Sequence, residues 1–188
     1  MNSVEQWFKS QNWEVQAFQK QCWKAYSQGK SGMLHAPTGS GKTYALWGGI
    51  VEEMSRSKIL PKGLHALWIT PLRALGVEIQ NATQKMISDI NPELQVGLRT
   101  ADTPQSQRTK LLKAPPFGLV STPESLHVLL GKKEHQKYFK QLKVVVVDEW
   151  HELLGSKRGV QVELALAYFS YIVPDLRVWG ISATLGNK

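Results

Sequence analysis

The stretch Ala36-Pro37-Thr38-Gly39-Ser40-Gly41-Lys42-Thr43, which follows the apolar run Met33-Leu34-His35, decides the fold of this chain. It fits the phosphate-loop pattern, in which a small residue is followed by four positions and then by Gly-Lys-Thr. Gly39 and Gly41 let the backbone turn so that successive N–H groups point at phosphate oxygens. The apolar run predicts a strand before the loop, and the residues after it predict a helix. This context favours a nucleotide site over a Gly-rich turn that matches by chance.

The remaining residues of the loop complete the expected phosphate site. Lys42 is expected to reach the β- and γ-phosphates, and the hydroxyl of Thr43 is expected to bind Mg²⁺. The backbone of Thr38 and Ser40 belongs to the same cradle around the phosphates. The ligands implied by the loop are therefore ATP and Mg²⁺.

Length and composition indicate one globular domain with a substantial core. The chain has 188 residues, of which 42% are hydrophobic and 20% charged. Its 23 Lys and Arg against 15 Asp and Glu leave a net charge of +8, an excess that attracts polyanions such as nucleic acid. Charge alone leaves solubility open as the alternative reason.

Other classes of protein are disfavoured by the sequence. Its single cysteine, Cys22, allows no internal disulfide, and its five histidines lack partners at metal-ligand spacing. No apolar stretch approaches the length of a membrane span, and the first residues do not resemble a signal peptide. We expect a cytoplasmic protein with no membrane partner.

Strand and helix patterns alternate along the chain. Residues Val4 to Gln28 have helical spacing, and we expect an N-terminal helical segment at 1–30 followed by an ATP-binding domain at 31–188. The unbroken run Val144–Val147 predicts a strand buried on both faces of a parallel sheet. The expected strands are Met33–Ala36, Ala66–Thr70, Val96–Arg99, Phe117–Ser121, Val144–Asp148 and Val178–Ser182. The alternation predicts an α/β, doubly wound and mainly parallel sheet with helices on both faces.

Three Thr-Pro pairs follow expected strands, at 70–71, 103–104 and 122–123. Because Thr caps helices well and Pro suits the first helical position, each pair is expected to start a helix. Helix N-termini bind phosphates, and ordinary capping is the alternative reading of any single pair. Together with the basic balance, they predict weak, salt-sensitive nucleic-acid binding. The residues expected to contact the strand are Pro71, Arg73, Arg99, Thr122, Pro123 and Glu124.

Two carboxylates close the most buried strand, in Asp148-Glu149-Trp150-His151. Asp148 is expected to hold Mg²⁺, as an acidic partner of a phosphate loop does. Glu149 is expected to orient or deprotonate the water that attacks the γ-phosphate. Helix capping is the weaker alternative, because carboxylates beside four valines need a strong partner.

These motifs resemble a known family. Ala36–Thr43, Asp148–His151 and Ser182-Ala183-Thr184 look like motifs I, II and III of superfamily 2 helicases of the DExH form. Trp68–Leu75 and Asp148–Gln161 resemble the Lhr family, and Trp179–Asn187 is most similar to the bacterial ligase-associated, DNA-damage-response DExH helicases. The resemblance covers essentially the whole chain and implies the first RecA-like domain of a P-loop NTPase.

The resemblance also implies roles for further residues. Gln19 stands where the superfamily often carries a glutamine that reads adenine. His151, Ser182 and Thr184 would couple the nucleotide state to movement, with His151 linking motif II to a second RecA-like domain. The chain ends just after motif III, so we expect that second domain and its arginine finger to be absent.

The implied function is that of an ATP-dependent translocase on single-stranded nucleic acid, with DNA and repair suggested by the resemblance. A bacterial, nucleoid-associated protein with a repair ligase or nuclease as partner is the matching expectation. Because an arginine finger contributes a factor of ~10³ or more, the isolated chain is expected to bind ATP–Mg²⁺ but to hydrolyse it poorly. A nucleotide-switched binding module, an RNA-directed helicase and a small kinase are the alternatives.

Overall fold

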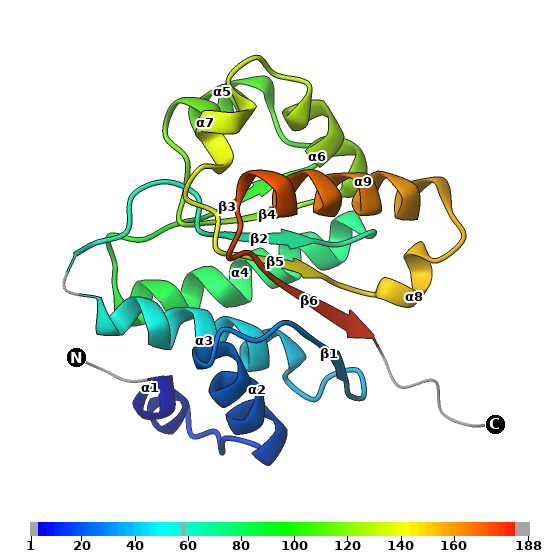
Figure 1. Ribbon diagram of the computed structural model, residues 1–188. Coiled ribbons are helices and arrows are strands. Elements are labelled where there is room, and N and C mark those ends of the chain that lie inside the picture. The colour runs from blue at the N-terminus through cyan, green and yellow to red at the C-terminus, as the bar shows by residue number, and fades with distance from the viewer. Residues whose placement is uncertain (1–3, 58, 183–188) are drawn as a thin grey trace.

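The computed structural model describes residues 4–57 and 59–182. In this part of the chain one parallel sheet has the strand order β1-β6-β5-β2-β4-β3 (Figure 1). The strands are β1 (Gly32–His35), β2 (Ala66–Ile69), β3 (Val96–Arg99), β4 (Gly118–Ser121), β5 (Val144–Val147) and β6 (Arg177–Ser182). The expected doubly wound, mainly parallel α/β fold is confirmed, and the strand ends differ from the expected ones by one residue at most.

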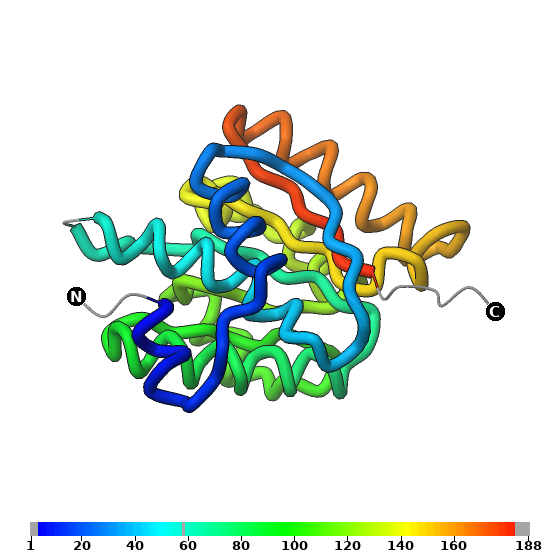
Figure 2. The backbone as a smooth tube through the Cα atoms, turned by 90° about the horizontal axis from the view of Figure 1, so that it is seen from below, coloured from blue at the N-terminus to red at the C-terminus, as the bar shows by residue number. Residues whose placement is uncertain are grey.

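Helices cover both faces of the sheet (Figures 1 and 2). One face carries α1 (Val4–Ser10), α2 (Ala17–Ser27), α3 (Lys42–Arg56) and α4 (Arg73–Ile90). The other carries α5 (Gln105–Lys113), α6 (Pro123–Leu130), α7 (His135–Phe139) and α9 (Lys157–Ile172). The short α8 (Trp150–Leu153) follows β5 at the carboxyl edge of the sheet.

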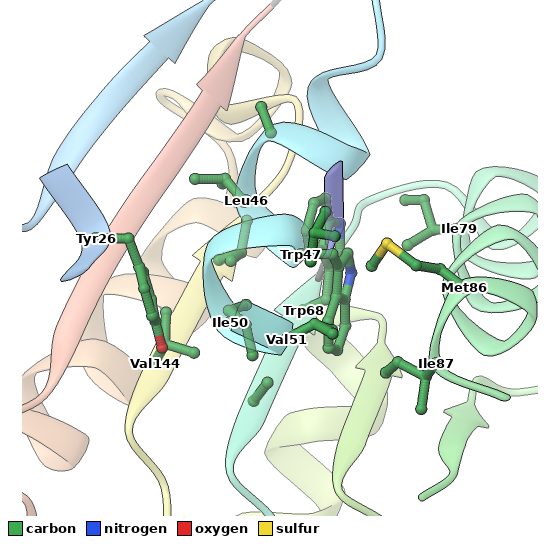
Figure 3. Packing of buried hydrophobic residues seen from close by; sticks show 14 of the residues in the cluster. Tyr26, Leu46, Trp47, Ile50, Val51, Trp68, Ile79, Met86, Ile87 and Val144 are labelled. Atoms are coloured by element: carbon green, nitrogen blue, oxygen red, sulfur yellow. The ribbon is translucent and has the colours of Figure 1, made fainter. Parts of the chain in front are cut away.

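Strand β5 shows why this sheet needs two layers of helices. Val144 and Val146 belong to the core under α1–α4, and Val145 and Val147 belong to the core under α6, α7 and α9. Successive side chains of a strand point to opposite faces, so a run of valines buries apolar surface on both sides. Figure 3 shows the first of these cores, in which the rings of Trp47 and Trp68 stack with centroids 6.0 Å apart.

The N-terminal segment differs from the single helical pattern read in the sequence. Two helices, α1 and α2, are separated by residues 11–16, and Asn12 takes a positive φ of 58° there. A left-handed residue interrupts a right-handed helix, which accounts for the break. Side chains of α1 and α2 share one core with α3 and the sheet, so the described part of 1–30 packs as one unit with the sheet that follows it.

The Thr-Pro pairs do not all start helices as expected. Thr122 is the N-cap of α6 and Pro123 its first residue, as predicted. The prediction is wrong at Thr70, because its N–H donates to Ser121 O and extends the ladder, so that α4 begins only at Arg73. At Thr103 the prediction is wrong by one residue, because Pro104 and not Thr103 is the N-cap of α5. The Thr103 hydroxyl instead accepts from the Thr100 N–H and donates to Leu98 O.

Candidate functional site

The strand order brings the three strongest sequence motifs to one end of the sheet. Strands β1, β6 and β5 are consecutive neighbours, and their carboxyl ends lead into Ala36–Thr43, Ser182 and Asp148. His35 pairs in register with Ser182, and the Ala36 N–H donates to Ser182 O over 3.5 Å. Ligands of open α/β sheets bind outside this carboxyl edge, so the candidate site lies where all three motifs meet.

The loop Ala36–Thr43 has the backbone that a phosphate cradle requires. Gly39 and Gly41 have φ values of 77° and 87°, which residues other than glycine adopt only at an energetic cost. Gly41 is the N-cap of α3, a helix of 15 residues, so the positive end of that helix faces the loop. The Lys42 ammonium donates to Ala36 O over 2.9 Å and thereby closes the loop on itself.

Gln19 reaches this loop from α2. Its Nε2 donates to Gly41 O over 3.1 Å, and its Oε1 accepts from the Gln16 N–H over 2.9 Å. A Cβ added at Gly41 would lie 2.7 Å from Gln19 Nε2, so the end of the Gln19 side chain would have to shift. The side chain of Gln19 is buried, and its hydrogen bond to Gly41 O helps to hold the loop in this conformation. Whether it also reads adenine stays a prediction.

Asp148 is a buried carboxylate beside the loop. Burial raises its pKa to about 6, and the negative charge of Glu149 adds to that rise. Trp68 Nε1 donates to Asp148 Oδ2 over 3.3 Å, and the Glu149 N–H donates to Oδ1 over 2.9 Å. The hydrogen bond from Trp68 and the positive charge of Lys42 lower the pKa of Asp148 and so partly offset the effect of burial. A carboxylate that is costly to ionise here favours a cation as its neighbour.

Glu149 lies in a strained conformation at the end of β5. Its φ of 48° and ψ of 46° are left-handed, and it is the N-cap of the short helix α8. Non-glycine residues pay ~1 to 3 kcal/mol for such backbone, and they gather at functional sites. The turn directs the Glu149 carboxylate away from Asp148 and toward His151, whose Nδ1 lies 3.4 Å from Glu149 Oε2.

His151 joins two of the motifs directly. Its Nδ1 lies 2.9 Å from Ser182 Oγ, within hydrogen-bond distance, as well as near Glu149. The sequence comparison implied a partner in a second domain, whereas the structure gives His151 a partner in this one. Thr184, the third residue expected to couple nucleotide state to movement, lies outside the described residues.

The residues of Ala36–Thr43 and Asp148 fit ATP and Mg²⁺. The loop offers an anion cradle at a helix N-terminus, Lys42 offers a cation, and Asp148 offers a buried carboxylate. Thr43 opens α3 beside Lys42, and its hydroxyl is the second expected oxygen ligand. No cluster of three or more His, Cys, Asp and Glu that could hold a metal unaided occurs within residues 4–57 and 59–182.

The residues expected to contact a nucleic-acid strand follow the other three strands, β2, β4 and β3. Arg73 is exposed but pairs with Asp102 at 2.8 Å, and Glu124 pairs with Arg158, whose Nη1 also donates to Pro71 O. Thr122 and Pro123 form the N-terminus of α6 at the same edge. Most charges expected to meet the strand are therefore already matched within the domain.

Arg99 is buried, contrary to an accessible contact with a strand. Only 4% of its surface is exposed, and its Nη1 has no hydrogen-bond partner among the described residues. Burial, and then the charge of Arg108, lower the pKa of this guanidinium. Arg99 ends β3 in register with Ser121 of β4, and its guanidinium lies near Arg108 and Tyr138.

Comparison with known proteins places this geometry in a family. The family model for DEAD/DEAH box helicases matches residues 16–188. The chain belongs to this family. The family and the RecA-like fold expected from the sequence are confirmed, while the closer resemblance to ligase-associated helicases stays a prediction.

Three relatives of this helicase domain are informative. The ATP-dependent helicase Lhr-Core of Sulfolobus acidocaldarius is 34% identical over 97% of this chain and 22% of its own length. The Lhr helicase/uracil glycosylase of Escherichia coli is 31% identical over 97% of this chain and 13% of its own length. The structure of Mycobacterium smegmatis helicase Lhr bound to ssDNA and AMP-PNP matches with a TM-score of 0.82 and 28% identity, over 97% of this chain and 24% of that one. The chain thus spans less than a quarter of the length of these relatives.

Sequence reasoning missed the part that Trp68 plays in the helicase site. Trp68 is fully buried on β2, and its indole links the Trp47 ring of α3 to the Asp148 carboxylate of β5. Most buried indole N–H groups find an acceptor, which is the one signal in the sequence. Which acceptor it finds depends on strand order and is invisible in the sequence.

Proposed function

We propose that this chain is the ATP-binding motor domain of a helicase that acts on single-stranded DNA. The observation that carries the proposal is the meeting of Ala36–Thr43, Asp148-Glu149 and Ser182 on three adjacent strands, with His151 between the last two. A passive nucleotide module needs the first two elements but not the third. The Mycobacterium smegmatis relative, bound to ssDNA and AMP-PNP, supports DNA as the strand over RNA.

Each residue of the nucleotide site has a distinct task in this proposal. Backbone N–H groups of Thr38–Gly41 bind phosphate oxygens, and Lys42 exchanges the Ala36 carbonyl for the β- and γ-phosphates. Thr43 and Asp148 hold Mg²⁺, which when bound neutralises charge that develops on the phosphates. Glu149 orients the attacking water and accepts its proton.

The contact between His151 and Ser182 is the proposed start of mechanical coupling. Glu149, His151 and Ser182 form one chain of polar contacts from the water-orienting carboxylate to the end of β6. A change at the γ-phosphate that moves Glu149 therefore reaches Ser182 through His151. Thr184 is the proposed next residue in this path.

The proposed strand path runs over the carboxyl ends of β2 and β4. The N-terminus of α6, at Thr122-Pro123-Glu124, offers N–H groups to a phosphate. Arg73 is exposed and is freed for a second phosphate when it leaves Asp102. Such exposed ion pairs are worth ~1 kcal/mol or less, so a phosphate competes with them readily.

Parts of the proposal concern the whole protein. They are a second RecA-like domain that closes on the nucleotide, a DNA-repair ligase or nuclease as partner, and a place at the bacterial nucleoid. All three rest on the family resemblance. In the described residues no helix is long and apolar enough to cross a bilayer.

The test combines nucleotide binding by this chain with ATP hydrolysis by the full-length protein. We expect the chain to bind ATP with Mg²⁺, Lys42→Ala to weaken binding at least ~10-fold, and Lys30→Ala, an exposed control, to have no effect. ATP hydrolysis by the full-length protein should rise with single-stranded DNA and stay lower with RNA. Hydrolysis that no nucleic acid stimulates would reject the motor in favour of a switch module.

Poor turnover by the isolated chain is part of the same proposal. Hydrolysis should stay close to background even with single-stranded DNA, because a superfamily 2 motor hydrolyses ATP between two domains. Robust turnover that disappears in Lys42→Ala would refute this half-motor reading.

A further inference from the structure

Most of the excess positive charge of this chain lies away from the nucleotide site. Residues 105–143 contain eight Lys and Arg against two acidic residues, Glu124 and Glu134, and so carry +6 of the net +8. This segment forms α5, α6 and α7, on the face of the sheet opposite to α1–α4 (Figure 1). A field of one sign over one surface attracts polyanions.

The lysines gather around a hollow where α5 and α6 end and α7 begins. Its volume is about 520 Å³. The charged and aromatic side chains that line it are Lys113, Lys132, Lys133, Glu134, His135, Lys137 and Tyr138. We call it the lysine pocket. A second hollow adjoins it through Lys137, and Lys140 and Tyr171 line that one.

Four lysines line the lysine pocket against one carboxylate, Glu134. Within the described part of the chain, none of Lys113, Lys132, Lys133 and Lys137 forms an ion pair. The two arginines at the carboxyl edge, Arg73 and Arg158, are instead matched by Asp102 and Glu124. A cluster of lysines without ion pairs among the described residues therefore lies outside the proposed strand path over β2 and β4.

Two hydrogen bonds of His135 and the buried ring of Tyr138 hold the pocket in place. His135 Nδ1 donates to Lys132 O over 2.6 Å, and its Nε2 lies 2.6 Å from the Tyr168 hydroxyl of α9. This bridge ties the loop that carries Lys132 and Lys133 to a long helix. In the wall, only 7% of the Tyr138 surface is exposed, and its hydroxyl has no hydrogen-bond partner among the described residues.

We propose that the lysine pocket binds the phosphodiester backbone of nucleic acid, as a second contact outside the motor groove. The proposal rests on the proposed function, which brings a strand to this domain. Two adjoining hollows that share Lys137 suit an extended chain of phosphates better than a single small anion. Tyr171, whose surface is 85% exposed beside Lys140, offers a ring on which an unpaired base stacks.

The position of the pocket suits a strand that leaves the carboxyl edge. Helix α6 begins at that edge with Pro123 and ends at Leu130, immediately before Gly131 and Lys132. Its eight residues span ~12 Å, about two nucleotides of extended strand. The same nucleic acid can therefore contact Thr122–Glu124 and the lysine pocket together, which raises its effective concentration at each site.

The test compares two triple variants with equal loss of charge. The pocket variant, Lys132→Gln/Lys133→Gln/Lys137→Gln, removes three of the four positive charges of the lysine pocket. The control variant, Lys9→Gln/Lys24→Gln/Lys30→Gln, removes three exposed lysines near α1 and α2 that form no ion pair within the described residues. Binding of labelled single-stranded DNA is measured by fluorescence anisotropy over a range of salt. We expect the pocket variant to lose at least ~10-fold in affinity and to flatten the slope of log K against log salt by ~2. The control should lose ~3-fold or less.

The outcomes separate this proposal from the proposed function. Equal losses in the two triple variants, with DNA still bound, would overturn the lysine pocket alone. A wild-type chain that binds neither ATP nor DNA would overturn the proposed function as well. Polyglutamate is the probe for an acidic protein partner: binding of polyglutamate that depends on the pocket, with DNA binding unchanged, would also overturn the proposal.

Tyr171 gives an independent readout. Tyr171→Ala should weaken single-stranded DNA ~5-fold or more but leave duplex of the same length unchanged, because only unpaired bases can stack on the ring. Since the side chain is exposed, the fold is unaffected. Equal loss for single strand and duplex would contradict the stacking role.

Discussion

Asp148 and Glu149 are neighbours in sequence but meet different environments. Asp148 continues the buried strand, with its N–H donated to Ile69 O, whereas Glu149 turns out of the strand in a left-handed conformation. One carboxylate is thereby held near Lys42 and the loop, and the other near His151. The two tasks proposed for them, metal binding and water orientation, follow from this divergence.

The raised pKa of Asp148 makes nucleotide binding depend on pH. Binding through Mg²⁺ needs the ionised carboxylate, so affinity for ATP–Mg²⁺ should fall as pH drops through about 6, approaching ~10-fold per unit below it. Calorimetric titrations from about pH 5 to about pH 8 measure this dependence. Asp148→Asn is the control, since it has no carboxyl to titrate and should lack this slope. An identical slope in that variant would assign the proton to ATP itself.

The same shift affects the stability of the nucleotide-free chain. The folded state holds the Asp148 proton more tightly than the unfolded state, whose pKa is near the ordinary 3.8. The contribution to stability is therefore full below pH 3.8 and is lost as pH rises through about 6. Mg²⁺ bound with nucleotide at neutral pH should offset this loss.

The indole N–H of Trp68 should lower the pKa of Asp148. Trp68→Phe keeps a buried ring but removes the N–H donated to Asp148, so the pKa of Asp148 rises and the pH midpoint of ATP–Mg²⁺ binding moves upward. Trp47→Phe is the matched control, because Trp47 is stacked on Trp68 but its Nε1 has no partner among the described residues. Both should lose comparable stability. A midpoint shift of the same size in both variants would show that packing, and not the hydrogen bond, sets the pKa.

Helix α3 carries the phosphate loop, and its position depends on close packing against α2. A Cβ at Gly48 would lie 2.3 Å from Trp23 Nε1, and Trp23 itself donates to Tyr44 O one turn earlier in α3. Glycine at this point lets the two helices approach, and Gln19 of α2 thereby reaches Gly41. The geometry of the loop is thus set partly by a contact outside it.

Gly48→Ala should therefore destabilise the domain. Overpacking typically costs ~1 to 3 kcal/mol, and the better helix propensity of Ala offsets up to ~1 kcal/mol. We expect a net loss of ~1 to 2 kcal/mol in urea unfolding. Gly76→Ala in α4 is the matched control, because its Cβ would meet Leu98 and Thr70 only at 3.4 Å. That variant should be neutral or slightly more stable; equal losses would show that the α2–α3 contact is not limiting.

The whole molecule should unfold as one unit. Val4, Trp7 and Tyr26 belong to the same core as Trp47 and Trp179, so the N-terminal helices and the sheet bury each other. Circular dichroism and tryptophan fluorescence should give coincident urea transitions. Saturating ATP–Mg²⁺ should shift both equally, by ~2.7 kcal/mol at a hundredfold excess over Kd. Two separate transitions would instead support an independent segment at 1–30.

The sequence alone determined which residues could form the chemistry of this protein. The phosphate loop, the Asp148-Glu149 pair and the strand–helix alternation depend on spacings of a few residues, which local backbone geometry fixes. For that reason the fold class and the family were predictable, and the candidate nucleotide site could be proposed from the sequence. The true starts of α4 and α5, by contrast, could not be predicted from the Thr-Pro pairs. At Thr70 a hydrogen bond of the sheet overrides the capping preference, and at Thr103 hydrogen bonds within the turn do so.

Only the tertiary structure decided how these residues are combined. Strand order places the proposed ATP-binding residues at the ends of β1, β6 and β5, and the proposed strand path at the ends of β2 and β4. The same order buries Arg99, gives Asp148 the indole of Trp68 and pairs His151 with Ser182. It also gathers lysines from α5, from α7 and from the turn between α6 and α7 into one pocket. Such contacts join residues tens of positions apart, and packing of the whole chain selects them.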